Sequence, residues 1–207
     1  MPDLNAARLQ ADFDALAQIG STGDGGVNRP ALGNAHREAR SWFLQRASDA
    51  GLATAIDGAG NHSAILPSRR SDARTLLLGS HLDSLPSGGR FDGALGVVAA
   101  LEALHTVSEA GLELPVHLEA IDFTDEEGTW GTLVGSRALA GLLTPDALAE
   151  PRGGRDAFER ACAENGLSPE AFPSARRDPA TLAGYLELHI EQGPRLVQSG
   201  HAIGVVT

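Results

Sequence analysis

Two histidines and several carboxylates recur at short spacing in this sequence and could together hold a metal ion. The string Thr75-Leu-Leu-Leu-Gly-Ser-His-Leu-Asp-Ser84 carries His81 and Asp83, whose side chains point to the same side of an extended chain. A carboxylate beside an imidazole fixes the ring's tautomer and raises its basicity, which is how a metal-binding histidine is usually supported. Asp92 follows in Gly88-Gly-Arg-Phe-Asp-Gly93, where it could also be the N-cap of a helix. For this stretch alone, a polar turn with a helix cap remains the alternative.

Three further polar side chains extend the set. Glu126 and Glu127 stand in Phe123-Thr-Asp-Glu-Glu-Gly128, and His189 begins His189-Ile-Glu-Gln-Gly-Pro194. Two imidazoles and two carboxylates suit Zn²⁺ and also Mn²⁺, Co²⁺ or Ni²⁺, and an aspartate can bridge two such ions. The candidate ligands are His81, Asp92, Glu127 and His189.

The two adjacent glutamates suit two different tasks. One of Glu126 and Glu127 can bind metal while its neighbour stays free as the general base that hydrolysis with a metal-bound water requires. A solvated acidic turn would be the simpler interpretation of this pair alone. The histidine motifs before and after it favour a site.

Strands and helices must bring these residues together. Apolar runs predict strands at 52–56, 62–66, 75–78, 116–123 and 181–190, and helical spacing predicts helices at 3–19, 31–50, 94–107 and 156–165, with a short helix or turn at 138–143. The alternation predicts an α/β sheet domain. The polar residues fall at or just beyond the downstream ends of strands, which is the edge where open α/β sheets bind ligands.

Composition excludes several classes of function. The chain has 207 residues, enough for one α/β domain, and its 16 basic against 27 acidic residues give a net charge of −11, so we expect no nucleic-acid partner. No apolar run reaches the length of a membrane span, and the first residues lack the pattern of a signal peptide. A single cysteine, Cys162, excludes an internal disulfide and suits a reducing compartment. We therefore expect a cytoplasmic protein without membrane contact.

The other histidines fit structural roles better than metal binding. His36 shares the polar side of its helix with charged neighbours and is expected to be solvated, whereas His62, His105 and His117 are expected to be packed or solvated. Cys162 lies in a helical segment, where a core or surface residue is a better interpretation than a nucleophile.

Four motifs together resemble one enzyme family. Gly79-Ser-His-Leu-Asp-Ser84, Gly88-Gly-Arg-Phe-Asp-Gly93, Phe123-Thr-Asp-Glu-Glu-Gly128 and His189-Ile-Glu-Gln-Gly-Pro194 are similar to motifs of the zinc-dependent amidase/hydantoinase/carbamoylase group, within the M20-type dinuclear metallohydrolases. This group includes N-carbamoyl-L-amino-acid hydrolases, allantoate amidohydrolases and β-ureidopropionases. The Gly-Gly before Asp92 and the His-Ile-Glu-Gln-Gly-Pro string favour this branch over the peptidases.

The resemblance implies a fold and a role for each site residue. The fold would be a zinc-exopeptidase-like sheet flanked by helices. His81, Asp92 and His189 would hold one of two divalent ions, with Asp92 bridging to a second ion bound by Glu127. Asp83 would orient His81, and Gln192 would face the substrate. Glu126 would take a proton from the water that attacks an amide or carbamoyl carbon, and pass it to the leaving nitrogen.

The resemblance also implies that family members are about twice this length. Residues 1–201 would be the first part of the catalytic domain, and residues 202–207 would begin the hinge to a lid and dimerisation domain that is absent here. In the family, a later segment supplies another histidine for the second ion, and full-length members dimerise. We therefore expect the 207-residue chain alone to bind metal without turnover. An M20-type aminopeptidase or dipeptidase, and a non-catalytic metal-binding fragment, remain the alternatives.

Overall fold

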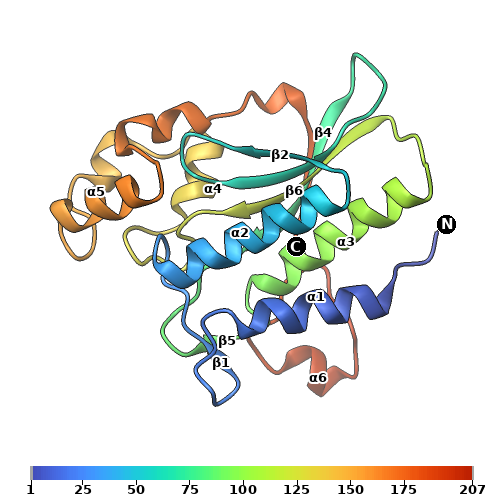
Figure 1. The fold of residues 1–207 in the computed structure, drawn as a ribbon, viewed down its shortest axis with the longest axis horizontal. Helices are drawn as coiled ribbons and strands as arrows, with labels where there is room; N and C mark the ends of the chain where they lie inside the picture. The colour runs from blue at the N-terminus through green and yellow to red at the C-terminus, as the bar shows by residue number, and fades with distance from the viewer. Residues whose placement is uncertain (1, 207) are drawn as a thin grey trace.

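Five strands form one mixed sheet in the computed structural model, which describes residues 2–206 (Figure 1). The strands lie in the order β2-β3-β6-β4-β7, with β4 parallel to both β6 and β7, and β3 antiparallel to both β2 and β6. Their bounds are Ala53–Ile56 (β2), His62–Leu66 (β3), Arg74–His81 (β4), Val116–Phe123 (β6) and Leu182–Leu186 (β7). A separate antiparallel pair joins β1 (Gly26–Val27) to β5 (Gly88–Gly89). The predicted α/β sheet is confirmed.

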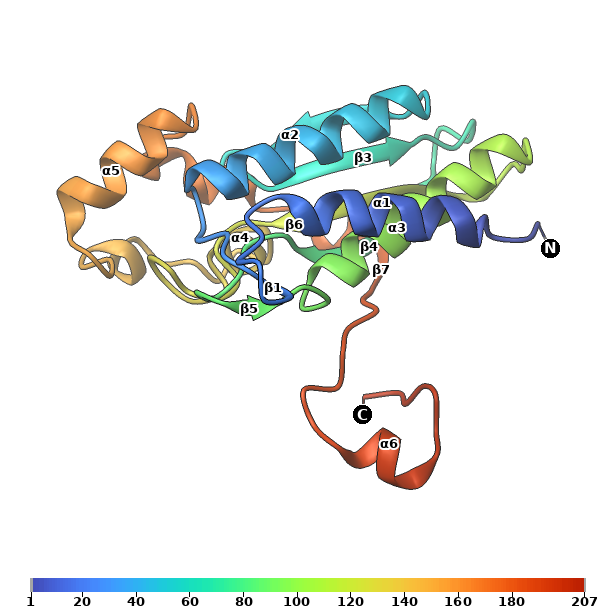
Figure 2. The same cartoon turned by 60° about the horizontal axis from the view of Figure 1, so that its bottom comes forward.

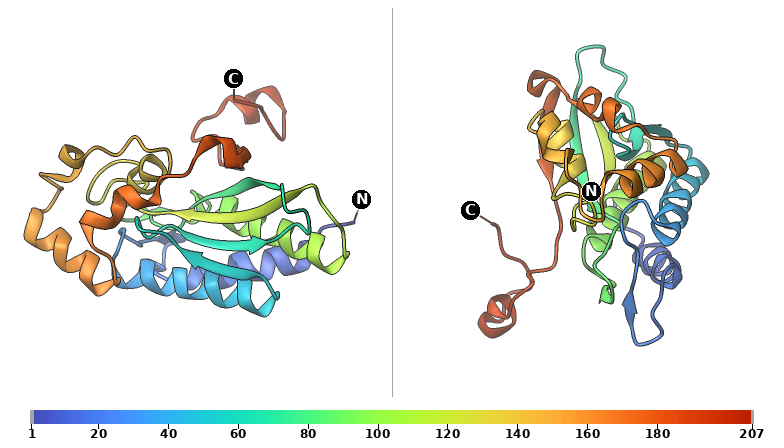
Figure 3. Two further views of the ribbon diagram at one scale, coloured as in Figure 1. Left: turned by 90° about the horizontal axis from the view of Figure 1, so that it is seen from above. Right: turned by 90° about the vertical axis from the view of Figure 1, so that its left-hand side faces the viewer.

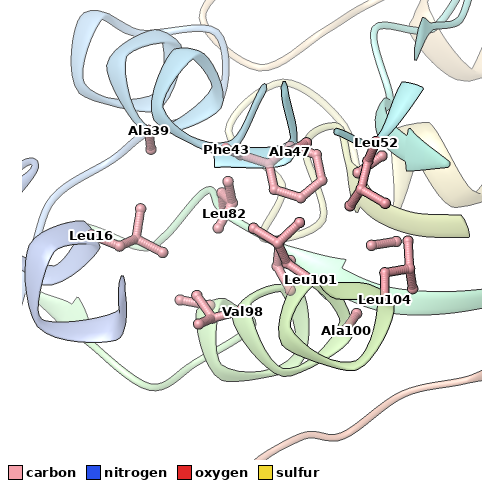
Figure 4. Close-up of a cluster of buried hydrophobic side chains, with 14 of the residues drawn as sticks. Leu16, Ala39, Phe43, Ala47, Leu52, Leu82, Val98, Ala100, Leu101 and Leu104 are labelled. Atoms are coloured by element: carbon pink, nitrogen blue, oxygen red, sulfur yellow. The ribbon is translucent and has the colours of Figure 1, made fainter. Parts of the chain in front are cut away.

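Three helices cover one face of the sheet, as Figures 2 and 3 show. They are α1 (Ala6–Gln18), α2 (Asn34–Asp49) and α3 (Ala94–Glu109). Side chains alternate along a strand, so Leu76 and Leu78 of β4 pack toward these helices. The main core lies here, and Figure 4 shows its side chains between the three helices and the sheet.

The other face of β4 and β6 packs against a short helix. Leu77 and Ile121 form a smaller cluster with Leu139 of α4 (Val134–Leu139). A third cluster, around Phe158 and Phe172, joins α5 (Arg155–Glu164) to the 3-10 helix η2 (Pro169–Ala175). The remaining short helices are η1 (Pro145–Leu148), η3 (Pro179–Thr181) and α6 (Arg195–Ser199).

Several element boundaries differ from those expected. The strand expected at 75–78 continues to His81, because Gly79, Ser80 and His81 remain paired with β6. The strand expected at 181–190 ends at Leu186, where its pairing with β4 stops. The short helix expected at 138–143 lies at Val134–Leu139. The first difference matters most, because it places His81 on the sheet itself.

His36 is completely buried, so the expectation that it is solvated is wrong. The side of α2 that carries it packs on the end of β6, where the Asp122 carboxylate is buried. Arg40 pairs with that carboxylate through Nε–Oδ2 at 2.7 Å, and the His36 Nδ1 accepts a hydrogen bond from the Leu32 N–H at 2.9 Å. Two polar side chains of this helix, His36 and Arg40, therefore face a buried carboxylate.

The segment after β7 lies apart from the helical layer. Figure 2 shows residues beyond β7 running away from the sheet to α6. Large apolar side chains are exposed along β7 and this segment, among them Leu186, Leu188, Val197 and Ile203. None of the helices in the described part of the chain is long and apolar enough to cross a membrane.

Replacing Gly79 by alanine should destabilise the sheet. Gly79 has φ of +146°, which side-chain-bearing residues rarely adopt, and an added Cβ would overlap the Ile121 carbonyl oxygen of the paired strand. We expect Gly79→Ala to lower the free energy of unfolding by at least about 2 kcal/mol in urea denaturation. Gly184→Ala is the control, since its Cβ would meet only Leu76 Cδ1 at 3.6 Å. Equal stability of the two variants would contradict this account.

Acid should destabilise the protein partly through His62. Burial, with a smaller contribution from the Arg40 charge, lowers the pKa of His62 to about 4. The unfolded chain binds this proton near pH 6.5 and the folded chain only near pH 4, so stability is lost as pH falls through that interval. Between pH 7 and pH 5 we expect the free energy of unfolding to fall by about 1–2 kcal/mol more in the wild type than in His62→Asn. If the free energy of unfolding changed equally with pH in the two proteins, this role of His62 would be refuted.

Candidate metal centre

The three parallel strands deliver the candidate residues to one edge of the sheet. His81 is the last residue of β4, Glu126 and Glu127 lie in the loop after β6, and His189 lies three residues beyond β7. Asp92 stands between β5 and α3. Since β4 lies between β6 and β7, its end is the centre of this edge. The structure therefore places these residues at or just beyond the downstream ends of the parallel strands or, for Asp92, in the turn before α3.

His81, Asp92 and His189 form the candidate metal centre. One possible ligand atom from each lies within 4.8 Å of the other two. Asp92 Oδ1 is 3.1 Å from the His189 Nε2 and 3.8 Å from the His81 Nε2, and the two imidazole rings are 5.9 Å apart between centroids. Asp92 Oδ1 is buried and accepts no hydrogen bond in the structure. A buried carboxylate oxygen without a donor, facing two imidazole nitrogens, is the arrangement that a cation would complete.

Asp92 does not cap α3, so that alternative is wrong. The N-cap is Gly93, and no side chain hydrogen-bonds to the N–H groups of the helix start, which donate to backbone carbonyls instead. Gly93 has φ of +62°, and an added Cβ would lie 2.5 Å from atoms of the His81 ring. The turn at Gly93 therefore fits closely against His81 and leaves the Asp92 carboxylate free to face the two imidazoles.

Asp83 contacts His81 differently from the expected carboxylate–imidazole hydrogen bond. The His81 Nδ1 lies 3.0 Å from the backbone carbonyl oxygen of Asp83. The nearest oxygen of the Asp83 carboxylate, Oδ1, is farther from the same nitrogen, at 3.6 Å. That carboxylate instead accepts hydrogen bonds from the backbone N–H groups of Glu126, at 3.3 Å, and Glu127, at 3.1 Å. Asp83 thus links the end of β4 to the loop that carries both glutamates.

Glu126 and Glu127 occupy different positions in this loop. Glu126 Oε2 lies 3.4 Å from the His81 Nε2, on the side where His81 also faces Asp92. Glu127 is not part of the three-residue metal group found among the described residues. Its assignment as the ligand of a second ion therefore stays a prediction.

The carboxylates give the site a strongly negative field. Burial raises the pKa of Glu127, and the neighbouring Asp92 and Glu126 charges raise it further against the opposing effect of His81. Burial opposes charge on His81, but the carboxylates of Asp83 and Glu126 outweigh it and raise its pKa. A divalent cation would relieve this repulsion. The donor set of two imidazoles and clustered carboxylates therefore fits a metal ion.

Gln192 lies at the site but contacts Asp92. Its side-chain N–H donates to Asp92 Oδ2 at 2.9 Å, and its own backbone has φ of +57°. The amide thereby fixes the Asp92 carboxylate with Oδ1 toward the histidines. Its expected role in substrate binding stays a prediction.

Two buried charged residues behind the site were missed in the sequence. Asp122 accepts a hydrogen bond from the Leu82 N–H at 2.7 Å, and Arg29 donates from Nε to the Leu82 carbonyl at 2.8 Å. An acidic residue inside the apolar run Ala120-Ile-Asp-Phe123 was the signal that could have pointed to Asp122. Arg29 stands in the short string Gly26-Val-Asn-Arg-Pro30, where no apolar periodicity indicates that the arginine side chain is buried.

Comparisons with known proteins agree with this geometry. The family model for "Peptidase family M20/M25/M40" matches residues 77–206. An N-carbamoyl-L-amino acid amidohydrolase of Geobacillus stearothermophilus is 38% identical over 207 residues, covering 99% of this chain and 50% of that protein. An allantoate amidohydrolase of Bacillus subtilis is 34% identical over 195 residues, covering 93% of this chain and 47% of that protein.

A solved structure extends the match to the fold. A hydantoinase/carbamoylase family amidase from Burkholderia ambifaria aligns with a TM-score of 0.84 and 36% identity, over 97% of this chain and 49% of that one. The chain thus spans about half the length of the relatives it matches. Because the family model covers most of the sequence and includes all the candidate ligands, the chain belongs to peptidase family M20/M25/M40.

Proposed function

We propose that this chain supplies catalytic residues of a metal-dependent hydrolase that cleaves non-peptide C–N bonds of linear amides. The substrate class is N-carbamoyl-L-amino acids, allantoate or related ureido acids. The observation that carries the proposal is the convergence of His81 and His189 on the unpaired Asp92 oxygen, with Glu126 beside them. The names of the relatives, N-carbamoyl-L-amino acid and allantoate amidohydrolases, support the substrate class.

The proposed metal ligands are His81, Asp92 and His189, and Asp92 and Glu127 are proposed to hold a second ion. Family M20 is metal-dependent. Two nitrogen ligands and one oxygen ligand suit Zn²⁺, and Mn²⁺, Co²⁺ and Ni²⁺ are accepted by similar sets. When bound, a divalent ion lowers the pKa of water and polarises a carbonyl oxygen.

Glu126 is the proposed general base. Its carboxylate lies next to His81 and is partly exposed, so water and substrate can reach it. It takes a proton from the attacking water and passes that proton to the leaving nitrogen. Asp83 holds the loop of Glu126 through two backbone N–H groups and so keeps the base at a fixed distance from His81. Gln192 is proposed to face the substrate from the other side of Asp92.

The second ion has fewer ligands in the described residues than the first. Asp92 and Glu127 are its proposed ligands, and neither is a histidine. We therefore propose that the isolated chain binds one ion more tightly than two and turns over poorly by itself. A cytoplasmic location, and dimerisation of longer proteins that contain this part, are also proposed.

Metal content tests the proposed centre directly. We expect the chain, dialysed against Zn²⁺ and then against metal-free buffer, to retain about one ion by elemental analysis, and His81→Ala to lose it. His105→Ala is the matched control, because His105 lies on α3 and its ring contacts Glu109 rather than the site. Both variants must give the circular dichroism spectrum of the wild type, so that a loss of zinc does not reflect unfolding. Zinc retention by folded His81→Ala would contradict the centre.

Glu126→Gln tests the general base in a complete catalytic domain. Residues 1–207 would replace the matching half of the Geobacillus stearothermophilus relative, since the alignment spans this whole chain and half of that protein. We expect the chimera to release ammonia from an N-carbamoyl-L-amino acid, and Glu126→Gln to lower kcat by about 10²–10⁴-fold while metal content is unchanged. Glu191→Gln is a neighbouring control, since Glu191 caps the start of α6.

Three outcomes would count against the proposal. Unchanged kcat in Glu126→Gln would remove Glu126 as the base. A chimera that hydrolyses a dipeptide but not a carbamoyl amino acid would favour the aminopeptidase or dipeptidase alternative. A folded, metal-loaded chimera with neither activity would favour a non-catalytic metal-binding chain.

A further inference from the structure

Leu82 stands between His81 and Asp83, and both of its backbone polar groups are held by buried charges. We propose that Arg29 and Asp122 are positioning residues that clamp the two peptide groups flanking Leu82 and thereby set the orientation of His81 and Asp83. The inference rests on the proposed function, in which His81 binds metal and Asp83 holds the loop of the general base.

Asp122 holds the peptide group between His81 and Leu82. Its Oδ1 accepts from the Leu82 N–H at 2.7 Å, and its Oδ2 accepts from the Arg40 Nε at 2.7 Å. Asp122 is fully buried, and it lies in β6 beside Ser80 of β4. The sheet and Arg40 therefore hold the Asp122 carboxylate in the position from which it accepts the Leu82 N–H.

Arg29 holds the next peptide group, between Leu82 and Asp83. Its Nε donates to the Leu82 carbonyl at 2.8 Å, and its Nη1 donates to the carbonyls of Leu16 and Ile19 at 3.3 and 3.2 Å. The Arg29 backbone exchanges two hydrogen bonds with Ser84, from N to Ser84 Oγ at 2.9 Å and from Ser84 N to the Arg29 carbonyl at 3.0 Å. Arg29 is completely buried, so this contact is shielded from water.

Fixing two successive peptide planes fixes the backbone rotations between them. The side chains of His81 and Asp83 leave the chain on either side of Leu82, so their relative direction follows from these planes. The Leu82 side chain adds a third anchor, since it is fully buried in the core between α1, α2 and α3 (Figure 4). Through the Asp83 carboxylate, the clamp also reaches the Glu126 and Glu127 amides.

Burying a charged side chain costs desolvation free energy, so stability by itself does not account for Arg29 and Asp122. Burial lowers the pKa of Arg29 to about 10, although the charges of Asp122 and Asp83 oppose that effect. Apolar side chains of similar volume often stabilise a core equally well or better. Charged groups instead give directional hydrogen bonds to a chosen N–H and a chosen C=O. That directionality is what a metal ligand and a loop anchor two residues apart require.

The test compares Arg29→Met, Arg29→Lys and Leu104→Ala with the wild type. Arg29→Met keeps the length of the side chain and removes its donors, whereas Arg29→Lys restores one charged donor. Leu104→Ala weakens the same core, and its side chain lies apart from that of Leu82 in Figure 4. Urea denaturation identifies conditions in which every variant is fully folded, and both readouts are taken there.

Zinc affinity is the first readout, measured by competition with a chromophoric chelator. We expect Arg29→Met to weaken Zn²⁺ binding by about 10- to 100-fold, the usual effect of losing a group that orients a ligand. Arg29→Lys should regain part of this loss, and Leu104→Ala should bind Zn²⁺ as the wild type does. Unchanged affinity in Arg29→Met, or an equal loss in Leu104→Ala, would overturn the proposal.

Amide hydrogen exchange in the metal-free chain is the second readout. We expect Arg29→Met to reduce protection of the Leu82, Glu126 and Glu127 amides at least tenfold more than that of the β2–β3 hairpin. A uniform change across the sheet would show a merely structural role and overturn the clamp. This readout needs no metal. If the wild type bound no Zn²⁺, the proposed function would fail, but the exchange data would still show whether Arg29 and Asp122 position Leu82.

Discussion

The site depends on one buried carboxylate at the end of β6. Asp122 accepts hydrogen bonds from the Leu82 N–H and from Arg40, and these contacts join the strand that carries His81 to the helix that covers it. An unpaired carboxylate in this interior would be strongly unfavourable. The arrangement of α2 and that of the turn after β4 are therefore coupled through a single side chain.

The next constraint is repulsion among the carboxylates at the sheet edge. Asp83, Asp92, Glu126 and Glu127 gather around His81, and each of them has different surroundings. Asp83 is buried and bonds to backbone amides, Asp92 faces two imidazoles, and Glu126 remains partly exposed. One cation at the histidines would lower the electrostatic energy of the whole group.

Glycine allows these groups to approach one another. Gly79 lets β4 lie closely against β6 with an unusual backbone angle, and Gly93 turns the chain against the His81 ring. Both positions lie within two residues of the candidate ligands His81 and Asp92, so the same short segments set the close packing and the candidate site. The exposed apolar side chains of β7 and the segment beyond it contrast with this packing.

The sequence by itself determined the α/β sheet, its site edge and the residues gathered there, because short apolar runs and the His, Asp and Glu motifs depend on local chain order. It also identified His81, Asp92 and His189, which the fold brings within 4.8 Å. Tertiary structure decided which partner each group meets: Asp83 bonds to the Glu126 and Glu127 amides, Gln192 bonds to Asp92, and His36 is buried. It alone revealed Arg29 and Asp122, whose partner Leu82 lies 53 and 40 residues away. Such contacts follow from the packing of separate elements, which no local pattern of residue types encodes.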